Sequence, residues 1–181
     1  MWCVAGVCFF FFFKQRTAYG VRLGLVGSER GIGDGGHGPG FAASVEWLAE
    51  AVEGAEAIAG MEARGFIFGA AVAARLRRPF LPIRKAGKLP CAVIGVDYEL
   101  EYGLDRLEMD PSAVAQGQQV AIVDDLLATG GTALAATELL RLAGAEVRRA
   151  AFVIDLPELG GSAKLASQAV DVRTLMGFEG D

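Results

Sequence analysis

The most informative segment of the chain reads Val120-Ala121-Ile122-Val123-Asp124-Asp125-Leu126-Leu127-Ala128-Thr129-Gly130-Gly131-Thr132. A short apolar strand runs into two adjacent carboxylates, and a Thr-Gly-Gly-Thr turn then opens a helix. The N-terminus of a helix offers free N–H groups and the positive end of a dipole, and glycines let the backbone approach an anion closely. We therefore predict a monophosphate cradle, with the two carboxylates placed to accept hydrogen bonds from sugar hydroxyls.

The alternative interpretation of this segment is an ordinary strand–turn–helix unit with an aspartate cap. Two adjacent acids followed by Thr-Gly-Gly-Thr make that interpretation less favourable. The segment is not a P-loop, because the sequence G-x-x-x-x-G-K-[ST] is absent from it. Ligands in open α/β sheets bind beyond the carboxyl ends of the strands, where this turn is expected to lie.

On both sides of this segment, short apolar runs alternate with stretches of helical periodicity. The spacing predicts helices over 41–52, 66–76, 132–142 and 162–168, the third of them ended by Gly144, and strands over 57–61, 80–83, 93–96, 107–109, 120–123, 147–154 and 170–175. This alternation favours an α/β fold with a mainly parallel twisted sheet flanked by helices.

Length and charge limit the classes of function. A chain of 181 residues, about half of them hydrophobic, is sufficient for one domain with a substantial core. A net charge of −5 argues against a nucleic-acid partner, since no basic excess is present to neutralise phosphates. The three cysteines form no C-x-x-C pair, which is typical of a protein of the reducing cytoplasm.

The N-terminal 37 residues differ in character from the rest. The apolar run Val4–Phe13 is shorter than the roughly 20 residues of a membrane-spanning helix, and its basic residues follow it, unlike those of a secretory signal. Gly31, Gly33 and Gly36 match G-x-G-x-x-G but follow no strand, so we interpret the match as chance, and His37 as incidental. We expect residues 1–37 to be a non-homologous segment, disordered or artefactual, and residues 38–181 to form the domain.

The segment 120–132 resembles the phosphoribosyl pyrophosphate (PRPP) signature of the type I phosphoribosyltransferases. Three further segments resemble the adenine-specific members of that family. Glu62-Ala-Arg64-Gly-Phe-Ile-Phe-Gly69 is similar to their pyrophosphate loop, Arg84-Lys85-Ala-Gly87-Lys88-Leu-Pro90 to the basic stretch that follows, and Tyr98-Glu-Leu-Glu101-Tyr102-Gly103 to their flexible catalytic loop. The resemblance runs from about Phe41 to the C-terminus and implies the type I phosphoribosyltransferase fold, with a flexible loop or hairpin over the site.

The resemblance implies a role for each matching residue. The 5′-phosphate of PRPP would bind to the backbone and side chains of Ala128, Thr129, Gly130, Gly131 and Thr132. Asp124 and Asp125 would hold the ribose hydroxyls, and the pyrophosphate would face Arg64 and Lys88, with positive potential added by Arg84 and Lys85. Mg²⁺ would be carried by PRPP itself, held mostly through ligand and water oxygens and not by a dedicated protein site. A cis peptide bond is expected between Glu62 and Ala63.

The implied reaction joins adenine and PRPP to give AMP and pyrophosphate, as in purine salvage. Glu101 would contact purine N7, Tyr102 would lie beside it when the loop closes, and Leu126 would pack on the base. The alternative for Glu101 and Tyr102 is a solvated hairpin edge. The family resemblance further suggests a homodimer. The cysteine usage, the net charge and the short apolar run indicate a cytoplasmic protein that binds neither nucleic acid nor membrane.

One departure from the family pattern concerns the base. Family members begin with a segment rich in proline and phenylalanine that ends near F-[KR]-D-I and contacts adenine, and residues 20–40 contain nothing similar. We expect a complete PRPP half of the site and a truncated base-binding half. Three alternatives stay open at this point: a hypoxanthine-type purine phosphoribosyltransferase, a non-catalytic PRPP-sensing regulator, and an Asp-rich α/β phosphotransferase of another type.

Overall fold

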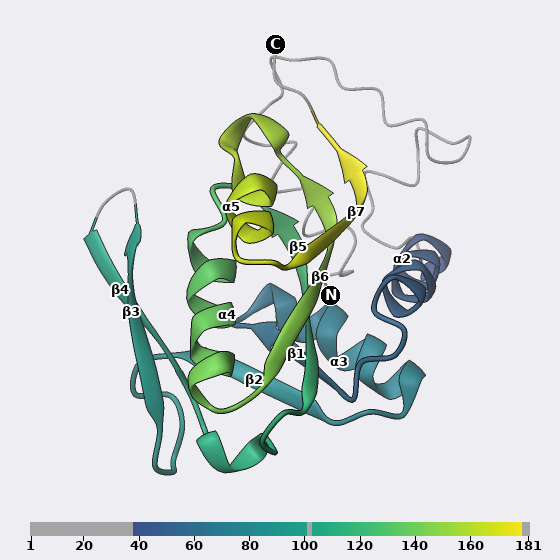
Figure 1. Cartoon of the computed structure of the whole chain (residues 1–181). Helices are drawn as coiled ribbons and strands as arrows, with labels where there is room; N and C mark the ends of the chain where they lie inside the picture. Colours follow the sequence, from purple (N-terminus) through teal and green to yellow (C-terminus); the bar gives the residue numbers. More distant parts are fainter. Residues whose placement is uncertain (1–37, 101–102, 179–181) are drawn as a thin grey trace. The chain divides into compact units, whose positions relative to one another are not determined.

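The structure is a computed structural model that describes residues 38–100 and 103–178 of the chain (Figure 1). Within them, Val45–Phe178 belong to one compact unit and Gly38–Ser44 to a second one. The seven-stranded sheet formed by the described residues, and the helices packed on its two faces, lie in the larger unit. The expectations for residues 1–37, including the Phe9–Phe13 run and His37, fall outside the described residues.

Helices and strands alternate along the described chain, as the sequence predicts. The helices are α2 (Gly38–Ala51), α3 (Arg64–Leu76), α4 (Gly131–Leu142) and α5 (Gly161–Ser167), with 3₁₀ turns η1 (Pro111–Ala113) and η2 (Pro157–Leu159). The strands are β1 (Ala57–Met61), β2 (Phe80–Lys85), β3 (Ile94–Leu100), β4 (Gly103–Met109), β5 (Gln119–Leu127), β6 (Glu146–Asp155) and β7 (Asp171–Gly177). None of the described helices is long and apolar enough to cross a membrane.

Seven strands of the described chain form one sheet in the order β3-β4-β2-β1-β5-β6-β7. Five neighbouring strands run parallel, in the order β2, β1, β5, β6 and β7. The other two are antiparallel: β4 pairs with β2, and β3 pairs with β4. The central strand β1 is apolar along its whole length, and all five of its residues are buried. That pattern is typical of parallel strands covered on both faces. The predicted fold class, a mainly parallel α/β sheet, is confirmed.

The helices α3 and α4 bury alternate side chains of the central strands. Ala57, Ala59 and Met61 of β1 belong to the same apolar cluster as the inner face of α4. Because successive side chains of a strand point to opposite faces, Ile58 lies on the other face of β1, and α3 packs against β1, β2 and β5. The sheet is thereby held between two helices, and its carboxyl-terminal edge is left for a site.

The β3–β4 hairpin is longer than the sequence pattern predicts. Its register runs from Ile94 opposite Met109 to Leu100 opposite Gly103. The strands predicted over 93–96 and 107–109 were therefore too short, and the intervening polar residues are paired, not looped. Polar side chains are tolerated there because one face of the hairpin is exposed, as at Asp97 and Glu99. Glu101 and Tyr102 fall outside the described residues.

Candidate active site

The two carboxylates of the central motif lie inside β5 and not after it. The strand was predicted to end at Val123, but it continues to Leu127 because its backbone keeps pairing with β6, with Asp124 opposite Phe152 and Leu126 opposite Ile154. Only 3% of Asp125 is exposed, whereas Asp124 is half-buried. The acids thus occupy the last part of a central strand, at the carboxyl edge of the sheet.

The turn after β5 leads directly into the N-terminus of α4. Gly130 takes a left-handed conformation with φ of 76°, which glycine adopts without steric cost, and the helix starts at Gly131. Gly130 contributes no side-chain cap to the helix. The first N–H groups of α4 are thus available to an external anion, together with the positive end of the helix dipole. The predicted cradle thus corresponds to a tight turn that leads into a helix N-terminus.

A cavity of about 270 Å³ lies at this edge of the sheet. Its walls come from the ends of β1, β2 and β5, from β3 and from the start of α4. The lining residues are Met61, Glu62, Ala63, Arg64, Lys85, Tyr98 and the whole run 124–133. The cavity therefore brings together the predicted site residues Arg64, Lys85, Asp124, Asp125, Leu126, Ala128, Thr129, Gly130, Gly131 and Thr132.

Arg64, the first residue of α3, joins the acidic pair. Its Nε lies 2.5 Å from Oδ2 of Asp125, 61 residues away in sequence. The Arg64 side chain remains 46% exposed, while that of Asp125 is 4% exposed. A buried carboxylate is stabilised by such a partner. Arg64 thereby presents a cation at the cavity wall beside the two acids.

Asp124 lies in a different environment from its neighbour. Its Oδ1 accepts a hydrogen bond of 2.8 Å from the Asp125 N–H, and a Cβ built on Gly65 would come within 2.9 Å of the same oxygen. The carboxylate thus packs closely on the backbone at the start of α3, where only glycine leaves room for it. Desolvation raises the pKa of Asp124 well above its usual range, and the negative charge of Asp125 raises it further.

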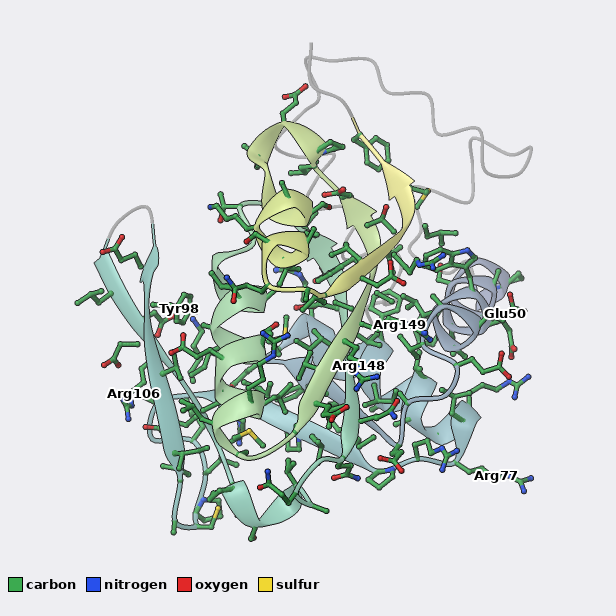
Figure 2. The ribbon with its side chains drawn as sticks, in the orientation of Figure 1. Glu50, Arg77, Tyr98, Arg106, Arg148 and Arg149 are labelled. Atoms are coloured by element: carbon green, nitrogen blue, oxygen red, sulfur yellow. The ribbon has the colours of Figure 1, made fainter. Side chains whose placement is uncertain are left out.

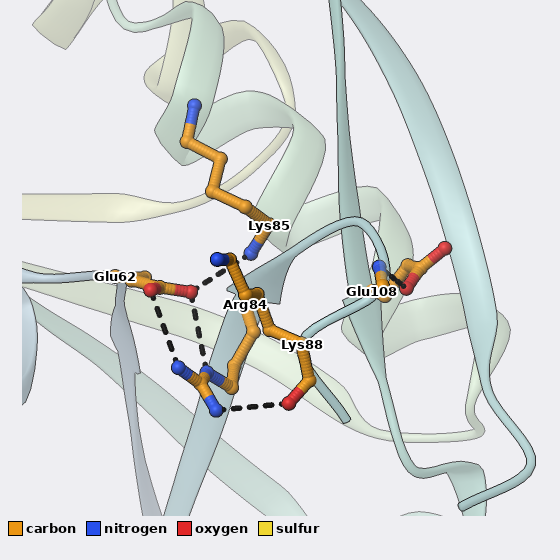
Figure 3. Close-up of polar contacts among 6 residues, drawn as sticks. Glu62, Arg84, Lys85, Lys88 and Glu108 are labelled. Atoms are coloured by element: carbon orange, nitrogen blue, oxygen red, sulfur yellow. Dashed lines mark hydrogen bonds and ion pairs between the residues drawn. The ribbon is translucent and has the colours of Figure 1, made fainter. Parts of the chain in front are cut away.

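The two basic residues at the end of β2 point in different directions. Arg84 donates to both carboxylate oxygens of Glu62, at 3.2 and 3.3 Å, and to the backbone carbonyl of Lys88 at 3.0 Å (Figure 3). The Lys85 side chain extends away from Glu62, while its backbone N–H donates to the Glu62 carboxylate at 3.1 Å. Neither Arg84 nor Lys88 is among the residues that line the cavity.

Glu62 is one of the residues whose contacts the sequence did not reveal. The hydrogen bonds from Arg84, and to a smaller extent the hydrogen bond from the Lys85 N–H, lower the pKa of Glu62 below its usual range. Its carboxylate ties the turn after β1, which contains the expected cis peptide bond between Glu62 and Ala63, to the end of β2. An acid directly after a buried strand was the available signal, but its basic partner lies 22 residues further on.

The helix α5 supports the cradle from outside. Lys164 Nζ donates to the backbone carbonyl of Thr129 at 2.8 Å. Ser162 Oγ donates to Asp155 Oδ2 at 2.7 Å, and Asp155 is only 7% exposed. Neither contact follows from the sequence pattern, because α5 shows no motif of its own.

Comparison with known proteins gives one consistent family. The family model described as phosphoribosyl transferase domain matches residues 38–175. A curated adenine phosphoribosyltransferase of Erythrobacter litoralis is 66% identical over 146 residues, covering 80% of this chain and 82% of that protein. The adenine phosphoribosyltransferase of Novosphingobium aromaticivorans is 62% identical over the same shares of both chains.

Solved structures agree with this. The adenine phosphoribosyltransferase of Thermoanaerobacter pseudethanolicus is similar with a TM-score of 0.73 and 47% identity, over 77% of this chain and 81% of that one. The enzyme of Trypanosoma brucei, solved with AMP, pyrophosphate and ribose-5-phosphate, is similar with a TM-score of 0.69 and 26% identity, over 76% of this chain and 64% of that one.

Proposed function

Because the chain belongs to the phosphoribosyltransferase family, we propose that it is an adenine phosphoribosyltransferase, which transfers the 5-phosphoribosyl group of PRPP to adenine and releases pyrophosphate. The observation that carries the proposal is the composition of the cavity at the carboxyl edge of the sheet. An anion cradle, the adjacent pair Asp124 and Asp125, and the cations Arg64 and Lys85 line it together, which matches the phosphate, the hydroxyls and the pyrophosphate of PRPP. The relatives named above are adenine-specific by name, which favours AMP as the product.

The cradle holds one end of the substrate. The 5′-phosphate binds to the N–H groups of Gly131 and Thr132 and to the hydroxyls of Thr129 and Thr132, with Ala128 and Gly130 shaping the loop. The carboxylates of Asp124 and Asp125 accept hydrogen bonds from the ribose hydroxyls. Fixing both ends of the sugar in this way orients its C1 toward the base, and such positioning contributes strongly to rate.

The reaction breaks one bond at ribose C1 and forms another. As the C1–O bond to pyrophosphate loosens, positive charge develops on the ribose and negative charge on the departing pyrophosphate. Arg64 and Lys85 stabilise that negative charge. Adenine N9 then bonds to C1 and gives AMP. We assign Arg84 and Lys88 to the same positive region at a greater distance, since neither lines the cavity.

We assign the base to Leu126, Glu101 and Tyr102. Leu126 is half-buried in the cavity wall and would pack on the purine face. Glu101 would contact purine N7 and control the protonation of the ring while N9 becomes nucleophilic. Tyr102 would lie next to Glu101. A loop that closes over the base would keep water from the ribose cation.

Mg²⁺ is the cofactor we propose, bound together with PRPP. The described part of the chain contains no group of three or more His, Cys, Asp or Glu side chains able to hold a metal ion. Mg²⁺ retains its waters and binds largely through the phosphate oxygens of its substrates, so we propose that PRPP itself carries the ion into the cavity. When bound, the ion neutralises part of the pyrophosphate charge. We further propose a cytoplasmic homodimer.

The decisive experiment measures AMP formation from PRPP and Mg²⁺ by chromatography, with adenine, hypoxanthine and guanine offered separately. The intact chain is compared with a version in which residues 1–37 are replaced by the N-terminal segment of the Erythrobacter litoralis relative. We expect product from adenine alone. Activity should be higher in the second version, because the relative's segment replaces residues 1–37, in which we find no counterpart of the family's adenine-contacting segment. Product from hypoxanthine and none from adenine, in either version, would contradict the adenine assignment.

A further inference from the structure

Three strands each contribute one side chain to a small polar cluster at the cavity wall. The members are Lys85 at the end of β2, Tyr98 on β3 and Asp105 on β4. Lys85 Nζ donates to the Asp105 carboxylate and, at 3.1 Å, to the Tyr98 hydroxyl. That hydroxyl donates in turn to Asp105 Oδ2 at 3.0 Å. Tyr98 and Asp105 are direct cross-strand partners in the hairpin.

The cluster reaches the cavity through two of its three members. Lys85 and Tyr98 line the cavity, whereas Asp105, on the strand β4 between β2 and β3, is not among the lining residues. Figure 2 shows Tyr98 on the side of the hairpin toward α4 and Arg106 on the opposite side. The Lys85 ammonium thus lies between the space where pyrophosphate is expected and a carboxylate of the hairpin.

Both cations that line the cavity have carboxylate partners before any substrate binds. These cations are Arg64 and Lys85, and each is paired with a carboxylate, Asp125 and Asp105 respectively. The Lys85 side chain is 40% exposed and that of Asp105 is 24% exposed, so this pair is open to exchange with an incoming anion. An ammonium has three donors, and a pyrophosphate oxygen competes for them directly.

We propose that Asp105 is a positioning residue that competes with pyrophosphate for Lys85, with Tyr98 guiding the ammonium between the two. This inference rests on the proposed function, because it takes pyrophosphate to be the anion in the cavity. When pyrophosphate is bound, Lys85 turns toward it and its bond to the hairpin weakens. When pyrophosphate leaves, Asp105 recaptures the ammonium. The carboxylate therefore weakens product binding and favours release.

The test is the dissociation constant of magnesium pyrophosphate, measured by calorimetry on the full-length chain. Asp105→Asn removes the competing charge and retains the size of the side chain. Asp97→Asn is the matched control, since Asp97 is a carboxylate of the same hairpin that pairs with Arg106 on its exposed face. Lys85→Ala and the Lys85→Ala/Asp105→Asn double variant complete a cycle that isolates the coupling between the two side chains.

We expect Asp105→Asn to bind pyrophosphate about 1.5- to 5-fold more tightly, as the loss of a partly exposed ion pair predicts. Asp97→Asn should bind like the unchanged chain, and the double variant should bind like Lys85→Ala. Tyr98→Phe, which keeps the ring in the core, should also bind at least as tightly as the unchanged chain. Weaker binding by Asp105→Asn would mean that Asp105 only supports Lys85 and would overturn the inference.

Equal tightening by Asp105→Asn and Asp97→Asn would likewise overturn it, since the effect would then be one of net charge. The inference is also overturned if Asp105→Asn tightens pyrophosphate binding in the Lys85→Ala background, because Asp105 would then act without Lys85. If the unchanged chain binds no pyrophosphate, the proposed function itself fails, and this inference with it. If Asp105→Asn does not fold, Asp105→Ser replaces it under the same criteria.

Discussion

Gly130 in the cradle and Gly161 at the start of α5 pack backbone against backbone. A Cβ built on Gly130 would lie 2.8 Å from the Gly161 Cα, and a Cβ on Gly161 would lie 2.3 Å from the Ala128 carbonyl oxygen. Real Cβ atoms do not come so close to backbone atoms. The phosphate loop therefore keeps its shape because both of these positions lack a side chain.

From this contact we predict that Gly161→Ala lowers the free energy of unfolding by about 1–3 kcal/mol, the usual cost of forcing an extra carbon into a packed site. The variant should also weaken PRPP binding, since the loop must shift to admit the methyl group. Urea unfolding measures the first effect. Gly177→Ala is the control, because its Cβ would meet only the Pro157 side chain at 3.8 Å. Equal stability of the two variants would show that the loop adapts freely.

The second prediction concerns Lys164, which donates to the Thr129 carbonyl. In a trans peptide the C=O and the following N–H point in opposite directions, so holding this carbonyl fixes the direction of the Gly130 N–H. Lys164→Met should raise the KM for PRPP about two- to tenfold, the effect of one lost hydrogen bond, with kcat little changed. Arg173→Met removes an equal charge from β7 and should leave the KM unaltered. Steady-state kinetics with varied PRPP checks both variants.

The third prediction follows from the raised pKa of Asp124. Between the ordinary pKa of about 3.9 and the raised folded value, the folded chain holds a proton that the unfolded chain releases. The free energy of unfolding therefore falls as the pH rises through this window. Asp124→Asn has no titrating carboxyl group at this position, so it should be more stable than the unchanged chain at neutral pH. The variant would lose the proposed contact between the carboxylate and the ribose.

The control for Asp124 has the opposite sign. Ser112 hydrogen bonds lower the pKa of Asp110, so its contribution is present above about pH 3.9 and is lost as the pH falls. Asp110→Asn should therefore be less stable at neutral pH. Urea unfolding of both variants across acid to neutral pH decides the matter, and a destabilised Asp124→Asn would show that the folded state favours the charged carboxylate.

The fourth prediction assigns Glu101 to the chemical step. A carboxylate that contacts purine N7 acts when the base reacts, so Glu101→Gln should lower kcat and kcat/KM together, by about 10²- to 10⁴-fold. PRPP affinity should hardly change, since the residue is separate from the cradle in sequence. The assay belongs in the version with the relative's N-terminal segment. Full kcat with weakened PRPP binding would place Glu101 in the phosphate site instead.

Much of the fold follows from local patterns in the sequence. The apolar run Ala57–Met61 is the observed strand β1, and the helix predicted over 132–142 differs from α4 by one residue at its start. The end of β5 did not follow, because the periodicity of one strand does not report that its backbone continues to pair with β6. The hairpin was predicted too short for a similar reason, since its polar residues pair across a register that only the folded chain defines.

Most of the residues proposed for the site from the sequence line one cavity, except Arg84 and Lys88, but their partners were not predicted. The cradle of residues 128–132 is local, so strand, glycines and helix start suffice to find it. The pair of Arg64 with Asp125 joins residues far apart in sequence, and adjacent Arg84 and Lys85 separate to different partners. Tyr98, Asp105 and Lys164 gain their roles from tertiary contacts alone, which no spacing in the sequence reveals.

The central claim is that the cavity beyond β5 binds PRPP, and calorimetry with PRPP and Mg²⁺ tests it most directly. The variant of choice is Gly131→Val, because a Cβ at Gly131 has its nearest neighbour at 3.5 Å and is tolerated by the fold, whereas one at Gly130 disturbs Gly161. We predict one PRPP site per chain, abolished in Gly131→Val and retained in Gly177→Ala. A folded chain that binds no PRPP, or a Gly131→Val variant that binds it unchanged, would contradict the account.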